Sequence, residues 1–187
     1  MTASGNPAIK LTYEDYLYLP EDGRRHEIID GEHHVTPAPT TRHQQIVTRL
    51  TRLLESVVSD RDLGVVLVAP TDVVLSDTDV VQPDLLFVSR KRARMVTEAN
   101  IDGAPDLVIE VTSPKTRRRD EITKRDLYAK HGVTEYWIVD PEAKVIEVYH
   151  ATEVGSELTA QVAAERGEHL TSSLLPNLEI RLDELFG

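Results

Sequence analysis

The chain of 187 residues carries 21 Lys and Arg against 32 Asp and Glu, a formal net charge of −11. No apolar run comes near the roughly 20 residues that cross a bilayer, and residues 1–10 lack an apolar core of the signal-peptide type. Cysteine is absent, which excludes disulfides, thiolate metal sites and cysteine nucleophiles. We therefore expect a cytoplasmic protein with no membrane contact.

The excess of acidic residues repels nucleic acid at long range. The basic residues are nevertheless clustered, at 90–94, at 115–119, and at Arg42, Arg49 and Arg52. Such clusters have two interpretations, which are a local positive groove on an acidic protein or merely solvated helix faces.

In the first third of the chain the pattern predicts a short helix, a hairpin and a long helix. Thr12 is a good N-cap for the first helix, which Pro20 and the turn after it would end. Asp30–Gly31 is a strong signal for a tight turn, here between two strands within 25–35. An amphipathic helix is predicted over 43–59 from apolar residues at helical spacing, namely Ile46, Val47, Leu50, Leu53, Leu54 and Val57.

Beyond residue 60 the apolar residues follow the period of strands. Strands are predicted within 65–75 (interrupted by Pro70), 84–88, 105–111, 135–139 and 145–149. Helical segments are predicted at 90–98 and 116–131, the second closed by Gly132, and the tail should hold a strand pair and a helix near 182–186. This order predicts an α/β fold with a mixed central sheet flanked by helices. We expect one domain over 1–187, with a flexible N-terminal segment at 1–10.

Two acidic residues interrupt apolar strands. Glu110 lies inside the run 107–111, and Asp84 directly precedes the run 85–88. A buried carboxylate is costly unless it is paired or binds a metal. Two carboxylates on neighbouring strands would form a hard-oxygen site suited to Mg²⁺ or Mn²⁺. The alternative is that Asp84 caps a loop and Glu110 pairs with an arginine.

Five segments in a fixed order resemble a known family: HEIIDGE (26–32), RHQ (42–44), QPDL (82–85), PDLVIEVTSP (105–114) and EYWIVDP (135–141). Together they are similar to the Uma family, which is classed among the endonucleases of the PD-(D/E)XK restriction-endonuclease-like superfamily. The resemblance runs from about Leu11 to Tyr149. It implies a mixed central sheet flanked by helices, in agreement with the predicted element order.

The resemblance also implies roles for individual residues. Asp84 would be the metal-binding aspartate and Glu110 the second acid, with the backbone carbonyl of Val111 as a further metal ligand. Glu27 would be the additional acid that several such nucleases contribute from an earlier element. The implied cofactor is Mg²⁺ or Mn²⁺, and the implied partner is DNA, with RNA not excluded.

The chain departs from the superfamily pattern at residue 112. Period-two alternation places residue 112 on the same face as Glu110, where the motif has lysine, but this chain has Thr112. The nearest replacement is Lys124, which shares a predicted helix face with Asp120 and Tyr128. The alternative is a surface ion pair between Asp120 and Lys124, which would contribute only about 0.3–0.5 kcal/mol.

The leading hypothesis is thus a metal-dependent DNA endonuclease, for which a homodimer is plausible because duplex cutting often pairs two sites. A second hypothesis is a nuclease fold that has lost catalysis and binds nucleic acid or protein. A third is a structural protein in which the carboxylates pair with Arg25, Arg42 or Arg117. His43 is a further candidate for contact with phosphate or water, whereas Trp137 is interpreted as core.

Overall fold

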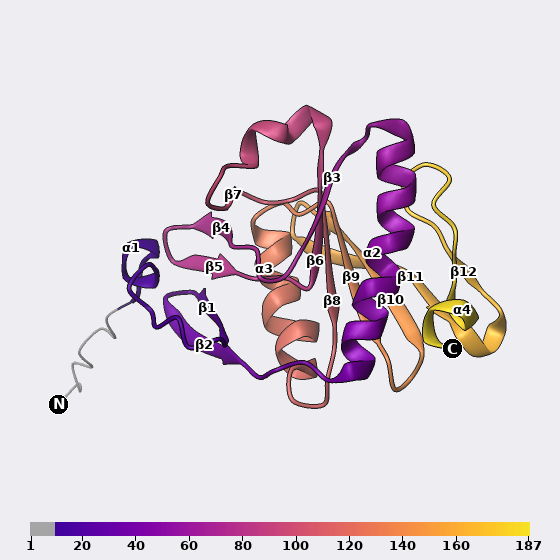
Figure 1. The fold of residues 1–187 in the computed structure, drawn as a ribbon, viewed down its shortest axis with the longest axis horizontal. Coiled ribbons are helices and arrows are strands. Elements are labelled where there is room, and N and C mark those ends of the chain that lie inside the picture. The colour runs from indigo at the N-terminus through magenta and orange to yellow at the C-terminus, as the bar shows by residue number, and fades with distance from the viewer. Residues whose placement is uncertain (1–9) are drawn as a thin grey trace.

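Two mixed β-sheets organise the computed structural model, which describes residues 10–187 (Figure 1). The predicted flexible segment therefore lies, except for Lys10, outside the described residues. The larger sheet has the order β11-β10-β9-β8-β6-β3, and the smaller sheet has the order β2-β1-β5-β4-β7. This arrangement confirms the predicted α/β class, with the six-stranded sheet in the central position.

The six-stranded sheet places the motifs of the sequence next to one another. Its strands are β3 (Gly64–Val68), β6 (Leu85–Ser89), β8 (Leu107–Val111), β9 (Glu135–Asp140), β10 (Val145–Thr152) and β11 (Gly155–Ala163). Strands β8 and β9 run parallel, whereas β6 lies antiparallel to β8 and pairs Leu85 with Ile109. Asp84, at the entry to β6, therefore lies beside the end of β8.

The five-stranded sheet begins with the predicted hairpin. Its strands are β1 (Arg25–Ile29), β2 (Glu32–Thr36), β4 (Val73–Ser76), β5 (Asp79–Val81) and β7 (Ile101–Asp102). Asp30 and Gly31 both have positive φ, 51° and 78°, as the primed turns of tight hairpins require. Strand β1 pairs with β5 through Ile28 and Val80, which brings the hairpin to the residues just before β6.

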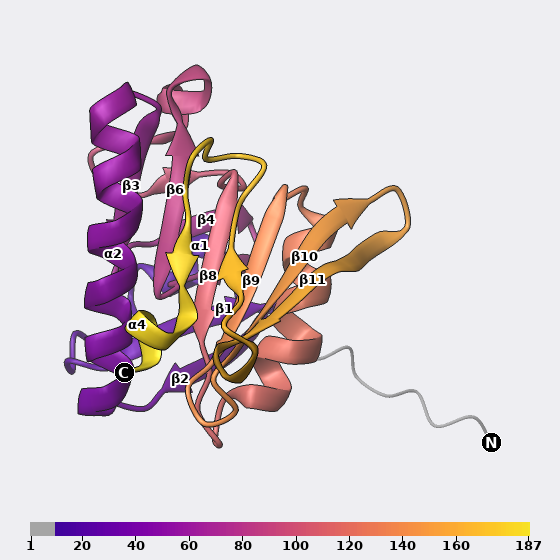
Figure 2. The same ribbon diagram turned by 90° about the vertical axis from the view of Figure 1, so that its right-hand side faces the viewer.

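The two faces of the six-stranded sheet have different covers, as Figure 2 shows. Helix α2 (Thr41–Arg61) packs its apolar stripe on one face, together with α4 (Leu182–Phe186) and the strand pair β12 (His169–Leu170) and β13 (Ile180–Arg181). The other face meets α3 (Arg125–Lys130) and residues of the five-stranded sheet. Along β8, Leu107, Ile109 and Val111 face α2, so Glu110 alternates to the side of α3.

Several element predictions needed correction. Helix α1 (Tyr13–Tyr16) ends well before Pro20, which was expected to end it. The predicted helix over 116–131 is a π-helical segment, Arg119–Lys124, followed by α3. The basic segment predicted to be helical over 90–98 is a shorter 3₁₀ helix, Arg90–Met95. Gly132 closes α3 with a φ of 80°, as predicted.

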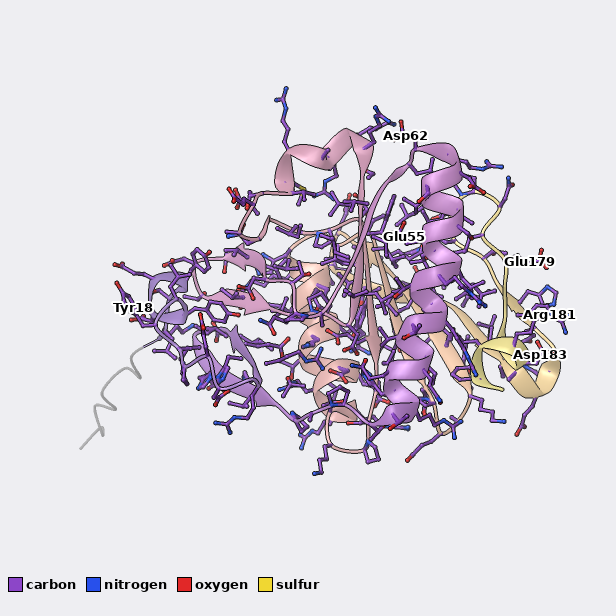
Figure 3. The ribbon with its side chains drawn as sticks, in the orientation of Figure 1. Tyr18, Glu55, Asp62, Glu179, Arg181 and Asp183 are labelled. Carbon is purple, nitrogen blue, oxygen red and sulfur yellow. The ribbon has the colours of Figure 1, made fainter. Side chains whose placement is uncertain are left out.

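The acidic excess lies largely on the periphery. Figure 3 shows Asp62 at the end of α2, and Glu179, Arg181 and Asp183 gathered around α4. Arg181 pairs there with Asp183, and both side chains are about half exposed. Within residues 10–187, no helix combines the length and the apolar character that crossing a membrane requires.

Candidate active site

Four side chains that the sequence analysis singled out come together from four separate elements. Glu27 is on β1, Asp84 precedes β6, Glu110 is on β8, and Lys124 ends the π-helical segment. All four are buried, with exposed fractions of 1%, 3%, 4% and 2% respectively. Four buried charged side chains need partners, and each finds them within this group or beside it.

Lys124 bridges two of the carboxylates. Its Nζ lies 2.7 Å from Oε1 of Glu27 and 2.8 Å from Oε1 of Glu110. Burial disfavours the charged amine, but the negative charges of Glu110 and Glu27 outweigh burial and raise the pKa of Lys124 above its ordinary value. The amine is therefore a fixed positive charge between two acids.

Lys124 reaches the sheet from the end of the π-helical segment. A π-helical turn holds more residues than an α-helical turn, so it changes which side chains share a face. Lys124 and Tyr128 both turn inwards, and the Tyr128 hydroxyl donates to the same Oε1 of Glu110 at 2.9 Å. Asp120 is buried as well, at 3% exposure, so a surface pair between Asp120 and Lys124 is wrong.

Asp84 is held by three donors. Arg25 Nη1 donates to its Oδ1 at 2.7 Å, while His43 Nε2 and the backbone N–H of Val111 lie 2.9 Å from its Oδ2. Burial opposes ionisation of this carboxyl, but the hydrogen bond from His43 and the charge of Arg25 lower its pKa to about 2. Asp84 is thus ionised throughout the neutral range.

Glu110 has the opposite electrostatic setting. Burial raises its pKa, Lys124 lowers it, and the nearby charges of Asp84 and Asp120 raise it again, with a net value of about 7. The hydrogen bonds from Lys124 and Tyr128 both end on Oε1, which leaves Oε2 for another ligand. Two neighbouring carboxylates with pKa values this far apart are typical of sites that bind cations or move protons.

Glu27 is tied to the rest of the site from several directions. The backbone N–H of Gln82 donates to its Oε1 at 3.0 Å, and Arg119 Nη2 lies 3.6 Å from its Oε2. Burial opposes ionisation of Glu27, but Lys124 and Arg119 outweigh it and lower the pKa. Glu27 therefore anchors Lys124 as an ionised partner.

A cavity of about 310 Å³ opens onto these groups. The charged side chains of the site that line the cavity are those of Asp84, Glu110, Asp120 and Lys124. Its other lining residues, which we call the rim, include prolines and basic residues, namely Pro37, Pro39, Pro114 and Pro141 with Arg25, Arg42, Lys115 and Arg119. The cavity thus has room for a small hydrated ion and a phosphate group beside the carboxylates.

Arg119 was missing from the predicted site, whereas Asp120 was named only for the helix face of Lys124 and Arg25 only as a partner of the carboxylates in a structural protein. Burial and the charge of Asp84, against the opposing charges of Lys124 and Arg119, raise the pKa of Asp120 to about 6. Arg25 lies two residues before Glu27 and therefore on the same face of β1. Arg119 carries no such signal, since its approach depends on the pitch of the π-helical segment.

Other sequence candidates fall elsewhere. Thr112 donates its hydroxyl to the carbonyl of Val139 at 3.3 Å and is only 4% exposed, so its side chain is committed to the sheet. Arg42 donates to the carbonyl of Pro141, and Arg117 pairs with Asp140. Of the three arginines proposed to neutralise the acids, Arg25 therefore does so. Trp137, fully buried, confirms the core interpretation.

The donor set suits a divalent cation that keeps part of its water shell. Among residues 10–187, no three His, Asp or Glu side chains form a group that could hold a metal ion by themselves. Mg²⁺, however, commonly takes one or two carboxylates and completes its shell with water and substrate phosphates. The carboxylates of Asp84 and Glu110, at one cavity beside the backbone of Val111, fit that pattern.

Comparison with known proteins places this geometry in a family. Residues 13–183 match the model of the Uma2 family, described as "Putative restriction endonuclease". A curated relative, an uncharacterized protein of Synechocystis sp., is 28% identical over 161 residues, which cover 81% of this chain and 80% of the relative.

Two solved structures are also similar. The first, described as a putative nuclease belonging to DUF820 from Anabaena variabilis, shares 24% identity and has a TM-score of 0.78. This match covers 94% of this chain and 97% of that one. The second, the type IIG restriction endonuclease BpuSI, has a TM-score of 0.40 at 11% identity. It covers 69% of this chain and 15% of that one, a likeness too slight to indicate a common fold. The chain therefore belongs to the Uma2 family and shares the fold of the Anabaena variabilis protein.

Proposed function

We propose that this protein is a divalent-metal-dependent endonuclease that hydrolyses phosphodiester bonds of DNA. The observation that carries the proposal is Lys124, which lies between Glu27 and Glu110 at the cavity that Asp84 also lines. Hydrolysis of a phosphodiester develops negative charge on phosphate oxygens, and a fixed cation beside a metal site stabilises that charge.

Each residue then has a defined task. Asp84 and Glu110, with the carbonyl of Val111, would hold Mg²⁺ or Mn²⁺. When bound, such an ion lowers the pKa of water and neutralises charge on the phosphate. Lys124 supplies its positive charge at the same place, and Glu27 keeps the amine oriented. Glu27 is therefore a positioning residue in this proposal.

The rim of the cavity favours a phosphate-bearing polymer. Arg42, Lys115 and Arg119 line it, so the acidic chain offers cations where a backbone would pass. We propose DNA as the substrate, with cleavage of RNA as an alternative outcome of the test. A homodimer would place two such sites on the two strands of a duplex.

One observation favours a second candidate function. Asp84 already has a cation in the chain, because Arg25 pairs with it at 2.7 Å, and residue 112 is not lysine. A nuclease fold whose carboxylates are neutralised from within would bind nucleic acid without cutting it. The two candidates differ in a single measurable property, which is metal-dependent cleavage.

The test is incubation of the purified protein with supercoiled plasmid, single-stranded DNA and RNA, each in Mn²⁺, Mg²⁺ and EDTA. Asp84→Asn and Glu110→Gln variants are compared with the exposed controls Asp60→Asn and Glu157→Gln. We expect nicking that requires the metal, is lost in both site variants and persists in both controls. Cleavage that continues in EDTA or in the site variants would refute the proposal. Retention of DNA without any cleavage would establish the binding protein instead.

A further inference from the structure

The Arg25 side chain covers one carboxylate oxygen of Asp84, and this side chain is free to move. Its Nη1 donates to Oδ1 at 2.7 Å and lies 3.4 Å from the carbonyl of Gln82. The other oxygen, Oδ2, accepts from the backbone of Val111 and from His43 at the start of α2. Those two donors are fixed by the sheet and the helix, whereas the Arg25 side chain is 19% exposed and borders the cavity.

We propose that Arg25 is a displaceable counter-cation, which covers Asp84 until a divalent ion takes its place and which then binds a substrate phosphate. This inference rests on the proposed function, because it assigns the metal to Asp84. It adds that metal and substrate bind cooperatively, since each makes the new position of Arg25 more favourable.

The charges around the cavity indicate that Arg25 and a divalent ion compete for the Asp84 carboxylate and do not bind it together. Among the described residues the site gathers these acids and cations: Glu27, Asp84, Glu110 and Asp120 against Arg25, Arg119 and Lys124. Lys124 and Arg119 both contact Glu27, so Arg25 is the cation of this group that pairs with Asp84. A divalent ion bound to Oδ1 would lie against that guanidinium, and two cations at such a distance repel each other.

The rim of the cavity is where the Arg25 side chain would bind after it leaves Asp84. Arg25 lines it together with Arg42 and Lys115, where a nucleic-acid backbone would supply phosphate oxygens. A guanidinium binds phosphate through two parallel hydrogen bonds, which compensates for the carboxylate it leaves. Substrate therefore favours metal binding by drawing Arg25 away from Asp84.

The experiment measures Mn²⁺ binding directly, by titration calorimetry and by the spin-resonance signal of free Mn²⁺. The proteins compared are the wild type, Arg25→Gln, Arg25→Lys and the matched control Arg24→Gln, whose side chain is 61% exposed and pairs with Asp22. We expect Arg25→Gln to bind Mn²⁺ about tenfold more tightly than the wild type. Arg25→Lys should lie between the two, and Arg24→Gln should match the wild type.

A second arm adds a short DNA duplex with uncleavable phosphorothioate linkages. We expect the duplex to raise the Mn²⁺ affinity of the wild type several-fold and to leave that of Arg25→Gln nearly unchanged. Asp84→Asn in either background should remove the site. The thermal midpoint of each variant confirms folding, and Arg25→Lys keeps the test valid if Arg25→Gln does not fold.

The outcomes separate this inference from the proposed function. Equal or weaker Mn²⁺ binding by Arg25→Gln, or the same gain in Arg24→Gln, would overturn the inference and leave the metal site standing. No Asp84-dependent Mn²⁺ binding in any variant would overturn the inference and the proposed function together.

Discussion

Lys124 places its Nζ 2.8 Å from Oε1 of Glu110, although the two residues are 14 positions apart and lie on different elements. A lysine at residue 112, directly after the end of β8, would have approached the same carboxylate from the sheet itself. Here the positive charge comes from the helix that covers the sheet, and Thr112 is left bonded to β9. The contact joins the helix to the sheet at the centre of the candidate site.

Replacing Lys124 by methionine should destabilise the protein in a pH-dependent way. The variant leaves Glu27 and Glu110 buried without their shared cation, which costs about 3–5 kcal/mol at pH 8. At pH 5 the loss should be smaller, because Glu110 then takes up a proton. Urea unfolding at both pH values measures the difference, with the exposed Lys91→Met as control. An equal loss at the two pH values would contradict the prediction.

Glu110→Gln should become more stable than the wild type as pH rises. The folded pKa of Glu110, about 7, exceeds its ordinary value of 4.5, so the folded state binds the proton more tightly than the unfolded state. Wild-type stability therefore falls between pH 4.5 and 7, by on the order of 3 kcal/mol. The amide cannot ionise and keeps an oxygen for Lys124 and Tyr128.

The measurement is the free energy of unfolding of both proteins at pH 5, 6, 7 and 8. The advantage of Glu110→Gln should grow from pH 5 to pH 7 and level off towards pH 8. A constant difference would show that Glu110 ionises in the folded state as it does in the unfolded chain. Glu157→Gln, which changes an exposed acid, should follow the wild type throughout.

Trp137→Phe should lower stability without altering cleavage. The indole is fully buried in the core beneath α2, and its Nε1 donates to Oε1 of Glu135 at 2.6 Å. Phenylalanine removes part of the buried surface and leaves that carboxylate oxygen without its donor, which costs about 2–4 kcal/mol. Circular dichroism measures the unfolding, and plasmid nicking below the transition should proceed at the wild-type rate. A loss of nicking in the folded variant would indicate a role at the site.

Asp79→Ala should loosen the five-stranded sheet from α3. The buried Asp79 carboxylate accepts from the backbone of Asp30 at 2.7 Å and from His131 at 3.0 Å, and so ties β5 to the hairpin and to the end of α3. Removing it leaves those donors unpaired, at a cost of about 2–4 kcal/mol. Hydrogen exchange should quicken in β5 and α3 before it does in β8. Uniform acceleration over the whole chain would argue against a local tie.

The sequence predicts those elements that form because of interactions between residues close together in the chain. The Asp30–Gly31 turn and the stripe of α2 follow from turn geometry and helical period, and both are present. Strand β11 was missed because its exposed edge position removes the apolar alternation that marks a buried strand. The pair of Arg25 with Asp84 joins residues 59 apart and depends on how β1 lies against β5, which no local pattern encodes.

The π-helical segment was beyond sequence reasoning for a related reason. The sequence pattern over 116–131 was interpreted with the period of an α-helix. That period correctly places Lys124 and Tyr128 on the inward face, but it gives no reason to expect a π-helical turn. The buried contacts of Asp120 and Lys124 stabilise that turn, and they exist only after the helix has packed on the sheet. Tertiary contacts thus decide the pitch that local propensity leaves open.

The wide π-helical turn also lets this helix change its length without moving its charge. Deleting one residue within Arg119–Lys124 would restore the α-helical pitch and keep the later side chains on nearly the same face, because a π-helical turn holds about one residue more than an α-helical turn. The same deletion in a regular α-helical stretch would rotate every later side chain by about 100° about the helix axis. The π-helical segment is therefore the part of this helix that tolerates a change of one residue while the amine still faces Glu110.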